Sequence, residues 1–151
     1  ADDVEAMISA IGTVTAESKD AIEEARAAYD ALTDEQKTLV ENYDTLTSAE
    51  TALAKIENDI KAADDVEAMI SAIGTVTAES KGAIEEARAA YDALTDEQKA
   101  LVENYETLTS AETTYSELTA EKELSFFEKL INWIVNAFNW IITLFKNIFS
   151  F

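Results

Sequence analysis

Several residue types are missing from this chain of 151 residues. It contains no cysteine, no histidine and no proline, and only three glycines. Without thiolate or imidazole groups, zinc sites of the common type, cysteine–histidine dyads and serine–histidine–aspartate triads are excluded. Three scattered glycines cannot form a phosphate-binding loop, and neither glycine-rich nucleotide motif occurs. We therefore expect a protein that is not an enzyme and has no cofactor.

Positive charge is also scarce, since 11 basic residues face 31 acidic ones and the formal net charge is −20. Such a chain repels nucleic-acid backbones, so we expect no nucleic-acid partner. Among the acidic residues, Asp2, Asp3, Asp64 and Asp65 are the best candidates for binding a divalent cation. No EF-hand spacing surrounds them, which favours a solvated helix face and no metal site.

Aromatic residues and charge both divide the chain near residue 124. All six phenylalanines and both tryptophans lie in the last 26 residues, whereas all five tyrosines precede residue 116. Residues 1–123 carry 30 acidic and 9 basic groups, a net charge of −21, while residues 124–151 have a net charge of +1. The sequence thus joins an acidic segment (1–123) to a nearly uncharged aromatic tail (125–151).

The acidic segment contains an internal duplication. Residues 1–51 and 63–113 are identical at 48 of 51 positions, with a period of 62 residues. Repetition of this kind usually supplies reach or multivalency. We predict three domains, residues 1–62 and 63–124 as helical repeats and 125–151 as a C-terminal assembly helix.

Apolar spacing and the absence of proline predict helices throughout. In the first copy we expect one helix from about Asp2 to Ile11, ended by Gly12, and a second from near Ser18 to Leu32. A capping box at Thr33–Gln36 predicts the start of a third helix, whose apolar face is Leu39, Val40, Tyr43 and Leu46.

A second capping box at Thr47–Glu50 permits a break or bend, after which nothing interrupts the apolar pattern. We expect one long helix from about Thr47 to Ile73 that ends the first copy and begins the second. The predicted fold is all-α: two tandem three-helix-bundle-like repeats sharing a connecting helix, plus a long hydrophobic C-terminal helix.

The tyrosines and arginines of the repeats lie at equivalent positions. Tyr29, Tyr43, Tyr91 and Tyr105 fall in register with the apolar stripes, which predicts core or core-rim positions. Arg26 and Arg88 are the only arginines. We expect Arg26 to pair with neighbouring carboxylates on its own helix, such as Glu23 and Asp30.

The string IGTVTAESKDAIEEARAAYDALTDEQKTLVENYDTLTSAE resembles the short three-helix repeats of secreted and cell-wall surface proteins of Gram-positive bacteria. The resemblance covers about residues 1–113 and implies an extracellular, cell-surface location with a structural role as stalk, spacer or adhesion module. The start Ala1-Asp2-Asp3 is consistent with removal of an export signal, and we expect an exported protein, although no signal sequence is present to read. Without proline there is no LPxTG wall-anchoring signal, which makes the tail the candidate anchor.

The tail begins with a capping box at Ser125–Glu128, which predicts a helix start there. A helix over its 26 residues from Phe126 spans about 39 Å. Polar residues recur in it at strict heptad spacing, and nearly all other positions are apolar. The heptad positions are Ser125, Lys129, Asn132, Asn136, Asn139, Thr143, Lys146 and Ser150.

Such a helix needs a partner, because its apolar arc is far wider than the stripe that a normal surface helix buries. Four partners compete: the protein's own bundle, a membrane as a single span, a membrane-bound oligomer or interfacial helix, and other copies of the tail in water. The longest charge-free stretch, 130–145, is short for a span and contains three asparagines.

We favour self-assembly into a filament, tube or ring, with the acidic repeats displayed outside. The alternative is a membrane-associated or pore-forming protein whose C-terminal helix inserts into or lies on lipid, with the repeats as stalk or adhesion module. The polar residues Asn132, Asn136, Asn139 and Thr143 are expected to set register. The expected contact residues, for assembly or for membrane, are Phe126, Phe127, Leu130, Trp133, Ile134, Phe138, Trp140, Ile141, Phe145 and Phe149.

Overall fold

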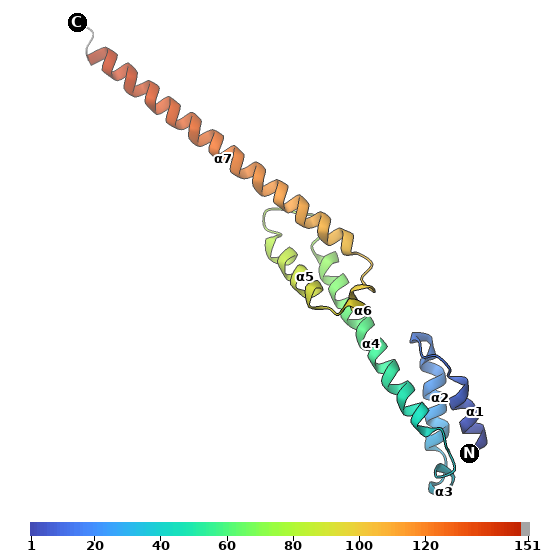
Figure 1. The fold of residues 1–151 in the computed structure, drawn as a ribbon. Coiled ribbons are helices and arrows are strands. Elements are labelled where there is room, and N and C mark those ends of the chain that lie inside the picture. Colours follow the sequence, from blue (N-terminus) through green and yellow to red (C-terminus); the bar gives the residue numbers. More distant parts are fainter. Residues whose placement is uncertain (149–151) are drawn as a thin grey trace. The chain divides into compact units, whose positions relative to one another are not determined.

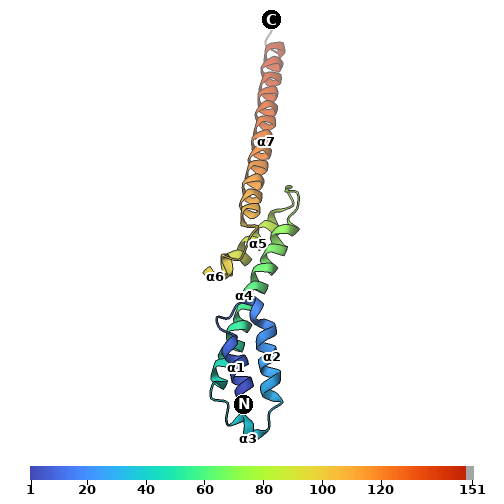
Figure 2. The same cartoon turned by 90° about the vertical axis from the view of Figure 1, so that its right-hand side faces the viewer.

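The structure is a computed structural model that describes residues 1–148, and every regular element among them is helical (Figures 1 and 2). The predicted all-α class is therefore confirmed. The elements are α1 (Asp2–Ala10), the 3-10 helix η1 (Ala16–Ser18), α2 (Lys19–Asp30), α3 (Asp34–Lys37), α4 (Tyr43–Ala72), α5 (Lys81–Ala93), α6 (Asp96–Lys99) and α7 (Tyr105–Ile148).

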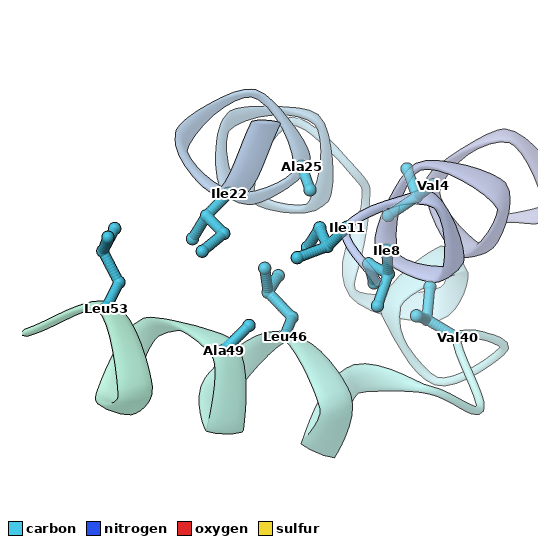
Figure 3. Close-up of a cluster of buried hydrophobic side chains, with 9 residues drawn as sticks. All are labelled: Val4, Ile8, Ile11, Ile22, Ala25, Val40, Leu46, Ala49 and Leu53. Carbon is cyan, nitrogen blue, oxygen red and sulfur yellow. The ribbon is translucent and has the colours of Figure 1, made fainter. Parts of the chain in front are cut away.

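The chain divides into two compact units, one of residues 1–66 with 94–103 and one of residues 67–93 with the chain from 104 onward. In the first unit, α1, α2 and the beginning of α4 surround a core of aliphatic side chains. Figure 3 shows Ile8 of α1, Ile22 of α2 and Leu46 of α4 pointing toward one another. Ile8 and Leu46 are fully buried, and each such side chain contributes about 1.5–3 kcal/mol.

Equivalent positions of the second copy are buried to a similar degree. Ile70, Ile84 and Leu108, which correspond to Ile8, Ile22 and Leu46, are at most 5% exposed. The duplicated sequence therefore buries the same apolar positions twice.

Gly12 ends α1 as predicted. Ile11 is the last residue with helical dihedral angles, and Gly12 follows it with a φ of +62°. Gly74, at the same place in the second copy, has a φ of +58°. Left-handed backbone is readily adopted only by glycine, so both positions require this residue type.

The predicted third helix from Thr33 through Leu46 is wrong. The capping box at Thr33 does open a helix, but α3 ends at Lys37 and α4 begins only at Tyr43. Leu39, which was expected on an apolar face, is 63% exposed, whereas Val40 is 7% exposed.

Contacts with α1 explain the break between α3 and α4. The Asn42 side-chain amide donates to the carbonyl oxygen of Glu5 at 3.0 Å and to Oγ of Ser9 at 3.2 Å. The Glu41 amide donates to the Glu5 carboxylate at 2.7 Å. These bonds join residues more than 30 positions apart, and they hold residues 38–42 in a conformation other than a continuous helix.

Two further predicted helix starts, at Thr47 and at Ser125, are also wrong. Thr47 lies inside α4, where its hydroxyl donates to the Asp44 carbonyl at 3.0 Å and caps nothing. Ser125 lies inside α7, which runs without a break from Tyr105 to Ile148 (Figure 1). Without proline or glycine to interrupt it, the backbone hydrogen-bond ladder continues through both sequences.

Candidate functional site

Most of α7 beyond residue 119 is exposed. From Ala120 to Phe145 every residue except Ala137 is exposed, although most residues after 123 are apolar. Trp133 is 68% exposed and Trp140 is 66% exposed. We call the exposed apolar residues of α7 the apolar face: Leu124, Phe126, Phe127, Leu130, Ile131, Trp133, Ile134, Val135, Phe138, Trp140, Ile141, Ile142, Leu144 and Phe145.

The predicted contact residues all belong to the apolar face, apart from Phe149, which lies outside the described residues. Five further members of this face were not among the predicted contact residues, although the same helical spacing contains the signal for them. The five are Leu124, Ile131, Val135, Ile142 and Leu144.

Polar residues of the tail occupy one narrow side of α7. At about 100° per residue, those from Ser125 to Thr143 fall within an arc of about 100°, and the apolar face covers about 220°. The four predicted register residues, which we call the polar stripe, are exposed in the structure. Within the stripe the Thr143 hydroxyl donates to the Asn139 carbonyl at 2.8 Å. The polar stripe consists of Asn132, Asn136, Asn139 and Thr143.

The tail differs from the corresponding part of α4 in the residues at the buried positions. Ala63, Val66 and Ile70 of α4 are all buried, as is Ile73 directly after it. One period later, α7 has Ser125, Glu128, Asn132 and Val135 at these positions. Three of the four are polar, so the tail does not reproduce the face with which α4 enters the second copy, and its apolar residues lie elsewhere on the helix.

Among the described residues, no helix combines the length and the apolar character needed to cross a membrane. The same residues contain no group of three or more acidic side chains arranged to hold a metal ion. Asp2, Asp3, Asp64 and Asp65 therefore form no described metal site.

Arg26 holds α2 against α4 in the first unit, and its pairing differs from the prediction. Its Nε and Nη2 donate to the two carboxylate oxygens of Glu50 at 2.5 and 2.6 Å. Asp30 lies 3.7 Å from Nη1, as expected, whereas the expected partner Glu23 has no ion pair with Arg26 among the described contacts. Sequence spacing along one helix could not reveal Glu50, which lies on another helix.

Two tyrosines complete this cluster, and the second unit repeats it. The rings of Tyr29 and Tyr43 are stacked with centroids 4.4 Å apart, and the Arg26 guanidinium lies 5.3 Å from the Tyr43 ring centre. Both tyrosines are partly buried at the core, as predicted. In the second unit, Arg88, Glu112, Tyr91 and Tyr105 have the same arrangement.

In both clusters the arginine and the glutamate shift each other's pKa in the direction that favours their charged forms, as in a structural ion pair. The hydrogen bonds from Arg26 lower the pKa of Glu50 below its ordinary value, and those from Arg88 do the same for Glu112. The carboxylates in turn raise the pKa of both arginines. Because the charges within each cluster satisfy one another, each cluster links two helices by a charge-assisted, bidentate contact.

Two hollows on the described surface are shallow, and each is lined by residues of a single helix. One lies on α7 between Leu118 and Lys129, and the other on α4 between Thr47 and Lys55. Neither encloses space for a ligand, so the apolar face is the strongest candidate for a functional surface.

Comparison with known protein families, with curated proteins and with solved structures found no match for this chain. Its function is therefore inferred from its own residues.

Proposed function

We propose that this protein is a secreted bacterial surface structural protein that assembles with copies of itself through α7. The tails pack together as an apolar core, and the acidic segment remains outside as a hydrophilic coat. In this proposal the coat consists of two tandem helical repeats that share a connecting helix. The extracellular location in this proposal follows from the resemblance that the repeat sequence suggests to surface proteins of Gram-positive bacteria.

The extent of the apolar face carries the proposal. Its fourteen side chains are between 38% and 68% exposed. At about 110 Å² each, they present on the order of 1,500 Å² of apolar surface, whereas the largest patch on a typical monomer is about 300–600 Å². A stable interface needs only about 800 Å² from each partner. The apolar face is therefore large enough for contacts on more than one side.

Other tails suit this surface better than a flat lipid boundary. A helix lying on a membrane typically has a strongly charged polar side and low overall hydrophobicity. Between Leu130 and Phe145 the tail has no charged residue, and its apolar arc of about 220° is wider than one flat boundary can cover. Packing among several helices covers such an arc, and contacts of this heterologous kind produce rings or open filaments.

Charge on the acidic segment fits the role of a coat. Its net charge of −21 favours solvation and opposes side-to-side aggregation of the repeats. Association is thereby restricted to the tail.

A matched pair of double variants tests the proposal in the full-length chain. Leu130→Glu/Leu144→Glu places two charges on the apolar face, where the leucines are 38% and 42% exposed. Leu39→Glu/Leu101→Glu makes the same chemical change in the loops after α3 and α6, where the leucines are 63% and 44% exposed. Both variants have the same composition and net charge.

Sedimentation and electron microscopy without detergent are the measurements. We expect the unmodified chain and the loop variant to form large assemblies and the apolar-face variant to remain dispersed. Equal assembly of both variants would assign association to another surface. A chain that stays monomeric until liposomes are added would contradict self-assembly and favour the membrane-associated alternative.

A further inference from the structure

The apolar face of α7 continues a line of residues that is already covered inside the second unit. Eighteen residues make five turns of an α-helix, so residues separated by 18 positions lie on one line along it. Leu108, Phe126 and Leu144 form one such line, and Tyr115 and Trp133 form another. Leu108 is fully buried, whereas Phe126 is 63% exposed and Leu144 is 42% exposed.

Helix α5 covers this line at its N-terminal end. It packs against the first part of α7 (Figure 1), and Ile84 and Ala87 of α5 and Leu108 of α7 are each buried. The ion pair of Arg88 with Glu112, with N–O distances of 2.6 and 2.7 Å, fixes α5 to α7. Because α7 continues without a break, α5 lies on the same side of α7 as Phe126. Phe126 is about 27 Å further along the helix than Leu108.

This arrangement restricts how a second tail can cover Phe126 and Leu144. Packed helices lie about 8–10 Å apart. A parallel neighbour in register would place its own α7 beside residues 105–119, in the space that α5 fills. An antiparallel neighbour runs away from α5 and can overlap the whole exposed stretch of the tail.

Electrostatic repulsion between copies also favours the antiparallel arrangement. Parallel, in-register tails bring together the acidic residues that directly precede the tail in each copy, such as Glu117, Glu121 and Glu123, whereas antiparallel tails separate them by the length of the overlap. An overlap of residues 124–148 is about 37 Å long, several times the Debye length of about 8 Å at physiological salt.

We propose that two copies of this chain pair antiparallel along the line through Phe126, Trp133, Trp140 and Leu144. This inference rests on the proposed self-assembly and adds the direction of the first contact. The overlap is centred near Val135, so that Phe126 of one copy meets Leu144 of the other. This antiparallel contact is isologous and closes a pair, while the rest of the apolar face, around Ile134 and Phe138, remains available for the heterologous contacts that join such pairs into larger assemblies.

Site-directed cross-linking tests the direction, because the natural chain has no cysteine. Full-length Phe126→Cys with an affinity tag is mixed with untagged Leu144→Cys, coassembled and treated with a short thiol cross-linker. Sedimentation first establishes that each variant assembles. A second pair, Leu130→Cys with Trp140→Cys, tests the same centre if the first pair assembles poorly. Asn132→Cys with Asn139→Cys, on the polar stripe, is the matched control.

We expect tagged-to-untagged products for the pairs on the apolar face, little product from either variant alone and little from the control. Products within each single variant, without mixed products, would show parallel, in-register tails and overturn the inference while assembly stands. Similar yields for all pairs, including the control, would also overturn it. If none of the variants nor the unmodified chain sediments as an assembly, the proposed function itself fails.

Discussion

Gly12 has a φ of +62°, and a methyl group built on it would meet no atom within 4 Å. A side chain at this position would therefore destabilise the protein through the strained backbone conformation and not through a steric clash. We predict that Gly12→Ala lowers the free energy of unfolding by about 1–2 kcal/mol, the penalty of left-handed backbone for an L-residue. Urea denaturation followed by circular dichroism measures this change.

Gly82 is the control for that substitution. It lies in α5 without a positive φ, and it likewise has open space around it. Gly82→Ala should raise the free energy of unfolding by about 0.5 kcal/mol, because alanine loses less conformational freedom in a helix. Loss of stability in both variants would contradict the assignment of the effect at Gly12 to its backbone conformation.

Glu50 gives the first copy a pH-dependent contribution to stability. Its pKa in the folded protein is lowered from the ordinary value of 4.5 by the hydrogen bonds from Arg26. A lowered folded pKa means that the contribution is complete above pH 4.5 and is lost as the pH falls through the lower value. We predict that Glu50→Gln costs about 1 kcal/mol at pH 7.

The difference between Glu50→Gln and the unmodified chain should disappear on acidification, because both then have a neutral side chain at position 50. Unfolding free energies measured at a series of pH values between 2 and 7 check this. Glu23→Gln, which changes the carboxylate that has no described ion pair with Arg26, is the control and should follow the unmodified chain. A pH-independent deficit for Glu50→Gln would assign its effect to packing.

At the scale of helices, two threonines in similar sequences have different roles. Thr33 caps α3, where its Oγ1 accepts from the Gln36 amide at 3.2 Å, whereas Thr47 lies within α4. Thr33→Ala should cost about 1 kcal/mol, the usual value of an N-cap. Thr47→Ala should be nearly neutral or slightly stabilising, since alanine is the better helix former. Equal losses in thermal unfolding would show that the second box also caps a helix.

The presence of helices could be predicted from the sequence, but most of the helix ends could not. Apolar spacing predicted the helices, and Gly12 marked the end of α1 because its signal is local. The capping boxes at Thr47 and Ser125 gave wrong predictions of helix starts, because such a sequence permits a helix to start without requiring it. The break before Tyr43 depends on bonds from Asn42 to α1, which no local pattern contains. Likewise, heptad spacing identified the candidate surface, whereas the position of α5 beside it required the structure.

Considered as a whole, the molecule places its only two tryptophans in the tail and none in the acidic segment. Trp133 and Trp140 are 68% and 66% exposed in the single chain, so their fluorescence reports on the apolar face alone. We predict that emission shifts to shorter wavelength as protein concentration rises and tails cover one another. Leu130→Glu/Leu144→Glu, at the same concentrations, should retain emission typical of exposed indole. A concentration-independent spectrum in the unmodified chain would contradict association through the tail.

Separation of charge and apolar surface within one chain also sets the conditions for assembly. Burial of the apolar face drives association, and repulsion between acidic segments opposes it. Raising the salt concentration from 10 to 150 mM shortens the Debye length from about 30 to about 8 Å, which screens repulsion across the antiparallel overlap. We therefore predict a lower critical concentration for assembly at 150 mM salt, measured by sedimentation.

Acidification should have the same effect without added salt, because protonation of carboxylates near the isoelectric point of about 4.1 removes the opposing charge. The Leu39→Glu/Leu101→Glu variant serves as the reference, since it retains the apolar face and adds two charges to the coat. Its critical concentration should lie slightly above that of the unmodified chain at low salt and equal to it at high salt. A critical concentration that rises with salt in the unmodified chain would show that tails are joined by ion pairs, and it would contradict an apolar contact between them.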